Sequence, residues 1–142
     1  MSEQAPPADL LRRAQRLHAE GRIDAALGIA RQAVAADPSS SDAWMYLGTT
    51  LITRRLAFEE GLAALGRAAD LAPNDPGVLY SLGWCCEFVA YRLEKQATKP
   101  YRDPGELYEL AADYLQRCID LGPEPGLKDD AEKLRDTIID RL

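Results

Sequence analysis

A Leu-Gly pair stands twice inside an apolar, helix-like run, and this feature constrains the fold of the 142-residue chain most. The two runs are WMYLGTTL at 44–51 and LYSLGWCC at 79–86, and they begin 35 residues apart. Glycine in a helix interior is less favourable than alanine by about 1 kcal/mol. Two glycines at equivalent places therefore predict a shared packing requirement, in which a second helix crosses the first where no side chain fits.

Three further segments lie in register with these runs. They read ARQAVAADP, LGRAADLAP and LQRCIDLGP, and they end at Pro38, Pro73 and Pro123. A second helix-like segment precedes each of them, namely LLRRAQRL, WMYLGTTL and LYSLGWCC. Two helices per unit at a period near 34 residues are typical of tetratricopeptide repeats.

The chain resembles the tetratricopeptide family over nearly its whole length, and the W-x2-L-G-x2-Y pattern of that family carries the resemblance. The second unit matches the pattern best, at Trp44, Leu47, Gly48 and Leu51. The third unit matches it less well, at Leu79, Leu82, Gly83 and Cys86. The first unit matches it least, at Leu10, Arg13, Ala14 and Leu17. The resemblance implies an all-α solenoid of antiparallel helix pairs, with about seven helices wound into a right-handed superhelix.

We expect one domain over residues 1–142. Repeat one covers about 7–38, repeat two about 41–73, repeat three about 76–123, and a capping helix about 126–141. Capping residues and helix stops predict three helices over about 7–20, 23–36 and 41–53. They further predict a fourth helix that ends near 71, a fifth that begins at 76 and continues past Tyr91, and a sixth over about 105–121. The third unit is longer than the family pattern requires, and its insertion lies near 92–105, where Lys99 before Pro100 disfavours helix.

Composition and motifs exclude several classes of function. A net charge of -6 argues against nucleic acid and anionic membranes as partners. No phosphate-binding, zinc-protease or nucleophile motif is present, so we expect no enzyme, no metal and no cofactor. The N-terminus lacks the pattern of a signal peptide, and three cysteines then indicate reduced thiols and a cytoplasmic location.

The histidine and the cysteines have structural interpretations. Adjacent Cys85 and Cys86 point about 100° apart on a helix and do not converge on a metal. Cys86 and Cys118 fall on core positions of the repeat, where a small buried hydrophobe fits. The single histidine, His18, is expected to be solvated or at the edge of a groove.

In the family, the first helix of each unit lines a concave groove that holds a peptide. Carried over by position, the candidate groove residues are Leu11, Arg12, Gln15, Met45, Tyr46, Thr49, Tyr80, Ser81, Trp84 and Phe88. Tyr80, Trp84 and Phe88 are spaced i, i+4, i+8 and form one aromatic stripe on a helix. Two interpretations stay open: an aromatic slot for a partner segment, or a stripe buried by the extended helix and the insertion.

Charged residues refine the kind of partner. Some members of the family grip a C-terminal carboxylate with a clamp of Lys, Arg and Asn side chains. The corresponding positions here hold Leu11, Gln15, Tyr46, Gly77 and Ser81, which carry no positive charge, so this kind of clamp is not expected. The insertion region carries a secondary basic patch in an acidic chain, made of Arg92, Lys95, Lys99 and Arg102. The patch is either a solvated loop or a contact for an acidic partner.

The sequence therefore predicts a non-enzymatic protein-interaction module, such as an adaptor, a scaffold or a small chaperone. Its partner would be another protein or a peptide segment. The alternative is a structural protein that self-associates, with the groove or an end of the stack as a homo-oligomer interface.

Overall fold

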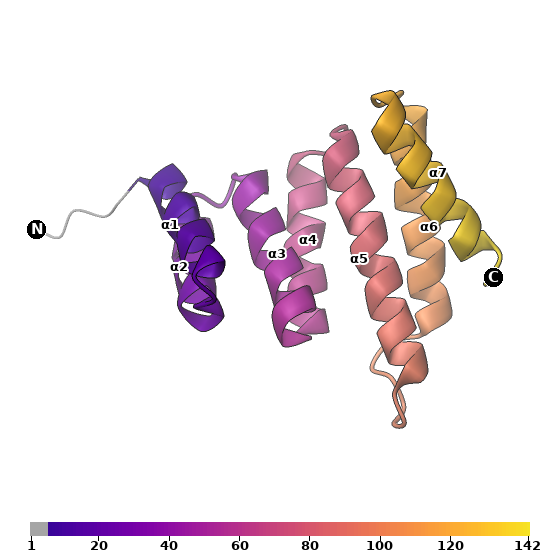
Figure 1. The fold of residues 1–142 in the computed structure, drawn as a ribbon, viewed down its shortest axis with the longest axis horizontal. Helices are drawn as coiled ribbons and strands as arrows, with labels where there is room; N and C mark the ends of the chain where they lie inside the picture. Colours follow the sequence, from indigo (N-terminus) through magenta and orange to yellow (C-terminus); the bar gives the residue numbers. More distant parts are fainter. Residues whose placement is uncertain (1–5) are drawn as a thin grey trace, which may run out of the picture. The chain divides into compact units, whose positions relative to one another are not determined.

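The structure is a computed structural model that describes residues 6–142. Over this range it contains seven α-helices and no strand (Figure 1). The helices are α1 (Pro7–Ala19), α2 (Ile23–Ala36), α3 (Ser41–Arg55), α4 (Phe58–Leu71), α5 (Pro76–Lys95), α6 (Pro104–Asp120) and α7 (Pro125–Ile139). The predicted all-α fold class is confirmed.

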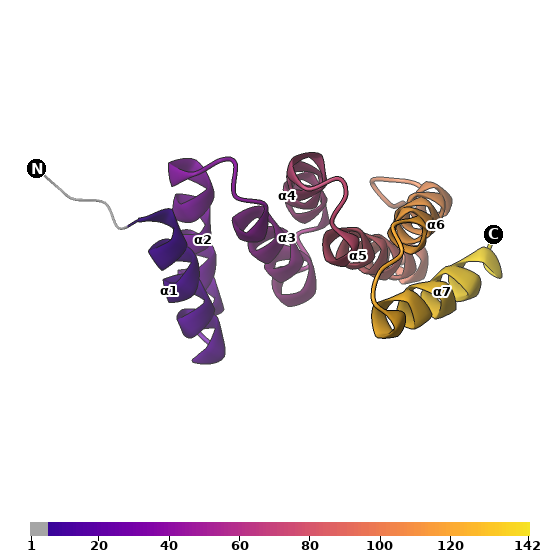
Figure 2. The same cartoon turned by 90° about the horizontal axis from the view of Figure 1, so that it is seen from above.

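The chain divides into two compact units. The N-terminal unit comprises residues 1–71, and the C-terminal unit comprises residues 72–142. In the N-terminal unit α1 packs on α2, α2 on α3, and α3 on α4; in the C-terminal unit α5 packs on α6, and α7 packs on both (Figure 2). The single domain expected over 1–142, like the handedness of its superhelix, stays a prediction.

Capping residues explain where most helices begin and end. The side chains of Ser40, Asp75 and Asp103 accept hydrogen bonds from the first turns of α3, α5 and α6. The helix α2 has the predicted bounds, and α1 ends before Gly21, whose φ of 79° suits glycine. The extension of α5 past Tyr91 to Lys95 is also confirmed.

The helix α3 is longer than predicted. It continues two residues past Thr53 to Arg55 and closes on Leu56, which has a left-handed φ of 53°. The Leu56 N–H donates to the Ile52 carbonyl at 3.2 Å. The two arginines that follow Thr53 suit this last turn, because cations are favourable near a helix C-terminus.

The structure confirms the reason for the two Leu-Gly pairs. A Cβ atom at Gly48 would lie 2.7 Å from Leu65 Cγ on α4, and one at Gly83 would lie 2.6 Å from Leu115 Cγ on α6. Carbon atoms in proteins pack at about 3.5–4.0 Å, so neither site has room for a side chain. Both glycines let the two helices of a pair approach closely.

The core of each unit is built mainly from aliphatic and small side chains. In the N-terminal unit Leu27, Ala33 and Leu47 belong to one buried cluster. In the C-terminal unit Leu79, Val89, Leu107 and Leu115 are fully buried, and all three cysteines lie among the buried residues. The core role predicted for Cys86 and Cys118 is confirmed.

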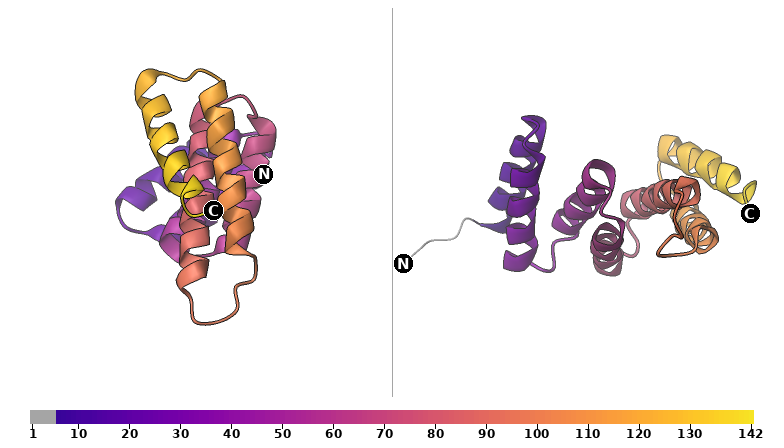
Figure 3. Two further views of the ribbon diagram at one scale, coloured as in Figure 1. Left: turned by 90° about the vertical axis from the view of Figure 1, so that its right-hand side faces the viewer. Right: turned by 90° about the horizontal axis from the view of Figure 1, so that it is seen from below.

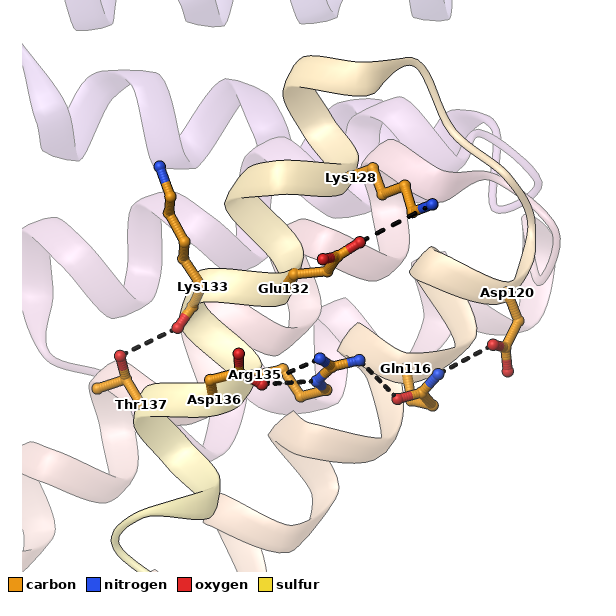
Figure 4. Close-up of polar contacts among 8 residues, drawn as sticks. All are labelled: Gln116, Asp120, Lys128, Glu132, Lys133, Arg135, Asp136 and Thr137. Carbon is orange, nitrogen blue, oxygen red and sulfur yellow. Dashed lines mark hydrogen bonds and ion pairs between the residues drawn. The ribbon is translucent and has the colours of Figure 1, made fainter.

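The helix α7 closes the C-terminal unit as a polar-backed cap. Of the face predicted to be apolar, Ala131 and Ile138 are buried, and Leu127 and Leu134 are half-buried. On its other faces Arg135 donates to Gln116 Oε1 of α6 at 3.1 Å, and Lys128 pairs with Glu132 (Figure 4). Buried apolar residues on one face and surface polar contacts on the others are what a terminal helix of a repeat protein requires.

Candidate functional site

The candidate groove residues of the C-terminal unit lie on α5. The rings of Trp84 and Phe88 are stacked, with centroids 5.5 Å apart and planes 14° apart. Trp84 is 39% exposed, whereas Tyr80, Ser81 and Phe88 are half-buried. Within this unit the aromatic stripe is therefore open at Trp84, and the insertion does not bury it.

Tyr80 is a half-buried residue at the start of the stripe. Burial raises the pKa of its hydroxyl, and the negative charge of Asp130 on α7 acts in the same direction. This phenol therefore stays neutral at ordinary pH, and its place beside α7 marks the side of the stripe that is packed. Trp84 is the exposed residue of the stripe.

The basic patch continues the stripe toward the end of α5. The Arg92 guanidinium lies over the Phe88 ring at 5.9 Å, and the Lys95 ammonium lies over the Tyr91 ring at 5.4 Å. Lys99 and Arg102 are exposed on the connection between α5 and α6, at the end of this helix pair away from α7's first turn (Figure 3). Cation–π contacts hold the α5 cations beside the aromatic rings.

Arg141, after the end of α7, was not among the predicted site residues. Its guanidinium lies over the rings of Tyr91 and Tyr108 at 5.4 and 5.7 Å, and it pairs with Glu94 at 3.7 Å. The Tyr108 hydroxyl donates to Glu94 at 2.7 Å. Arg141 thus connects the residues after α7 to α5 and α6. Its partners are 33 or more positions away in the sequence, so no local pattern indicates them.

One phenol and one carboxyl near Arg141, those of Tyr108 and Glu87, have raised pKa values. Burial and the hydrogen bond to Glu94 raise the pKa of Tyr108 to about 12, against an opposing effect of Arg141. Burial also raises the pKa of Glu87, which the charge of Arg141 counteracts. Arg141 is therefore the cation that compensates the acidic side chains of α5.

The candidate residues of the N-terminal unit are mostly engaged in contacts of their own. The Tyr46 hydroxyl lies 3.0 Å from His18 Nδ1 and donates to the Ala14 carbonyl at 3.4 Å. Thr49 Oγ1 donates back to the Met45 carbonyl at 2.8 Å. These contacts join α1 to α3 and leave the polar groups of Tyr46 and Thr49 satisfied inside the unit.

The remaining candidates of the N-terminal unit lie on its surface. Arg12 pairs with Asp9 one turn earlier on α1, and Gln15 is exposed. Leu11 and Met45 are half-buried. His18 is half-buried too and contacts Tyr46 edge to face, a partner that the sequence did not indicate because the two residues are 28 positions apart.

Metal sites, ligand pockets and membrane spans each need features of their own. In the part of the chain from 6 to 142, no three His, Cys, Asp or Glu side chains gather as a metal site would require. A hollow of about 250 Å³ in the C-terminal unit, lined by Leu79, Arg117 and Asp120 among others, is smaller than the roughly 300–1,000 Å³ of ligand pockets. None of the helices described here has the length and apolar character needed to cross a membrane.

Comparisons with known proteins agree with this architecture. Residues 7–50, which cover α1, α2 and most of α3, match the family model of the tetratricopeptide repeat. No curated protein matches the sequence.

Two solved structures have a similar fold. The first is the type III secretion chaperone SycD of Yersinia enterocolitica in complex with a peptide of the translocator YopD. It superposes with a TM-score of 0.69 at 14% identity, over 94% of this chain and 92% of that chain. The second is MamA, with a TM-score of 0.55 at 19% identity, over 95% of this chain and 77% of that chain.

The repeat match and the fold agree with each other. Paired helices with a glycine or a small residue at each crossing account for the match over 7–50, and the structural likeness extends over the remaining helices. The chain is therefore an all-α helical repeat protein, and its residues 7–50 match the tetratricopeptide repeat.

Proposed function

We propose that this chain is a non-enzymatic interaction module that binds a segment of another protein. The fold supports this, because repeats of helix pairs present extended surfaces for binding rather than a catalytic site. SycD, whose fold is similar, was solved with a peptide bound. In the C-terminal unit the segment would lie on the α5 stripe of Tyr80, Ser81, Trp84 and Phe88.

The open Trp84–Phe88 stack is the observation that carries the proposal. A tryptophan that is 39% exposed presents a large apolar area, and stacking on Phe88 holds its ring in place. Tryptophan and other aromatic residues are enriched among the residues that dominate binding energy in protein interfaces. Because the ring is already ordered, little side-chain entropy is lost when a partner covers it.

The candidate residues of the N-terminal unit have a smaller part in the proposal. Their polar groups are bonded within the unit, at Tyr46 and Thr49, or paired locally, at Arg12. The half-buried Leu11 and Met45 and the exposed Gln15 would supply contact area. We expect substitutions at these positions to weaken binding less than substitutions on α5.

A capture experiment with three forms of the protein tests this proposal. Wild type, Trp84→Ala and the control Ile139→Ala would each be used to capture proteins from a lysate of the source cells. Ile139 is a matched control because it is also a large exposed apolar residue of the C-terminal unit, at 51%. We expect one partner to bind wild type and Ile139→Ala and to be lost from Trp84→Ala, with circular dichroism unchanged.

Two results would contradict the proposal. Equal capture by all three forms would mean that the α5 stripe is not the binding surface. Light scattering of the wild type, in which mass rises with concentration and stays constant for Trp84→Ala, would instead favour the alternative of self-association.

A further inference from the structure

The end of α5 combines exposed aromatic rings with cations in one continuous row. Trp84, Phe88 and Arg92 follow each other at four-residue intervals, so they lie along one face of the helix. Trp84 stacks on one side of the Phe88 ring, and the Arg92 guanidinium lies over that ring at 5.9 Å. Tyr91 and Lys95 repeat the same pairing beside it.

Carboxylates near this row are occupied by other contacts. Glu94 accepts the Tyr108 hydroxyl at 2.7 Å and pairs with Arg141 at 3.7 Å. Asp103 accepts the Gly105 N–H at 3.2 Å as the cap of α6. The negative charges closest in sequence to the basic patch are thus held by α6 and by the end of the chain.

The cations of the basic patch, unlike Glu94, form no ion pair with the described residues. All four are exposed, and the ion pairs found among residues 6–142 include none of them, whether Arg92, Lys95, Lys99 or Arg102. They are four of the nine Lys and Arg residues in 72–142, a stretch with 14 Asp and Glu residues. A local positive region on an acidic unit attracts a negatively charged partner and selects against a positive one.

We propose, on the basis of the function proposed above, that the end of α5 and the connection after it bind an acidic segment of a partner protein. One aromatic or large aliphatic side chain of the segment covers the Trp84–Phe88 stack. Its carboxylates lie against Arg92 and Lys95 and, farther along, against Lys99 and Arg102. Both parts of the surface are needed, because charges at an interface rim give specificity and on-rate, and the apolar stack gives most of the affinity.

A partner protein fits this surface better than a second copy of the chain. A second copy would bring its own excess of carboxylates, 14 against nine Lys and Arg residues over 72–142, so the two copies would repel each other outside the basic patch. Nucleic acid is disfavoured by the excess of carboxylates over the rest of the unit.

A library of random 12-residue peptides displayed on phage is the probe for this proposal. It would be selected against the full-length wild-type protein, and the enriched peptides would be synthesised and titrated at 50 and 300 mM salt. We expect the enriched peptides to carry Asp or Glu beside Trp, Phe or Leu. Affinity should fall about tenfold at the higher salt, because exposed charge contacts are screened.

Two charge-reversal variants locate the site. Arg92→Glu/Lys99→Glu should weaken the selected peptides about tenfold or more, because attraction becomes repulsion. The control Lys128→Glu/Lys133→Glu makes the same change in net charge on exposed positions of α7, and it should leave affinity within about twofold. Circular dichroism of both variants would verify folding.

The possible outcomes separate this inference from the function on which it rests. Peptides that need Trp84 but carry no carboxylates, or that bind Arg92→Glu/Lys99→Glu normally, would remove the acidic-segment proposal and leave the interaction surface standing. Failure to enrich any peptide would remove both. Tighter binding of a labelled 12-residue oligothymidylate, or a dimer in sedimentation that the same variant abolishes, would overturn the proposal in favour of nucleic acid or a second copy.

Discussion

The N-terminal and C-terminal units use the same helix crossing but present different surfaces. Gly48 against Leu65 and Gly83 against Leu115 are equivalent contacts, with nearly the same close approach. Around Gly48 the neighbouring polar side chains bond within the unit, as Tyr46 does to His18. Beyond Gly83 the helix runs on to Lys95 and carries the exposed rings of Trp84 and Tyr91, with the cations Arg92 and Lys95 lying over aromatic rings. The two units share the crossing, and the residues outside it give them different surfaces.

The largest difference in stability between the two units is expected at alkaline pH, because all three cysteines lie in the C-terminal unit. Burial raises the pKa of Cys85 and Cys86 to about 12, above the value near 8.5 of an unfolded thiol. The stability that these neutral thiols contribute is complete below about pH 8.5 and is lost as the pH rises toward 12. We expect unfolding free energy to drop by on the order of 3 kcal/mol between pH 9 and pH 11.

Urea unfolding at a series of pH values measures this loss. Cys85→Ala/Cys86→Ala should show a flatter pH dependence, whatever its stability at neutral pH. Hydrogen exchange would show whether α5 and α6 open before α1 to α4. An equal acceleration of hydrogen exchange in both units would contradict the prediction that alkaline pH destabilises the C-terminal unit more.

The crossing glycines should respond alike in both units. Gly48→Leu and Gly83→Leu are each expected to lower the free energy of unfolding by over about 2 kcal/mol, because a side chain would overlap Leu65 or Leu115. Thermal and urea melts followed by circular dichroism give the values. Gly66→Ala is the control, since a Cβ there meets no atom within 4 Å and should stabilise the helix by up to about 1 kcal/mol. An unchanged melting temperature in either leucine variant would refute the packing explanation for that pair.

Arg141 connects the residues after α7 to α5 and α6 of the C-terminal unit. Arg141→Ala removes the contacts with Tyr91, Tyr108 and Glu94, and we expect a loss of about 1 kcal/mol because the guanidinium is partly exposed. The charge of Arg141 lowers the pKa of Tyr108, so the variant should raise that pKa further, in a spectrophotometric titration. Lys128→Ala is the matched surface control, and a Tyr108 titration that does not move would show that Arg141 is not held there.

The smallest effect is expected at the polar contact of the N-terminal unit. Tyr46→Phe removes the hydroxyl that bonds His18 and the Ala14 carbonyl, and it should cost about 0.5–1 kcal/mol. A double-mutant cycle with His18→Ala measures how much of this loss in stability comes from the interaction between Tyr46 and His18. A coupling energy near zero would mean that the two rings only lie next to each other.

Local chemistry made most of the helix pattern predictable. Prolines, capping side chains and Gly21 mark helix ends within a few residues, so α2 and the extension of α5 were predicted correctly. The error at α3 arose at Leu56, since a left-handed leucine has no sequence signal of the kind that glycine provides. The crossing glycines were predictable because the chain repeats them, and a single copy would have looked like an ordinary helix defect.

The candidate site was less predictable, because tertiary contacts decide it. Spacing alone placed Tyr80, Trp84 and Phe88 on one face, but whether the stripe is covered depends on how α6, α7 and the connection pack. The partners of His18 and Arg141 are 28 and at least 33 positions away in the chain. Such contacts follow from the arrangement of helices and from no local pattern.

The position of the α5–α6 connection has a consequence for how a protein of this type changes. The contact that sets the helix pair is at Gly83 and Leu115, whereas the cations begin at Arg92 and continue past the end of α5. Changes between 96 and 102 leave that contact untouched, and they also spare the buried Leu93 of α5 and Asp103, the cap of α6. This stretch can therefore vary in length and charge without altering the crossing of α5 and α6.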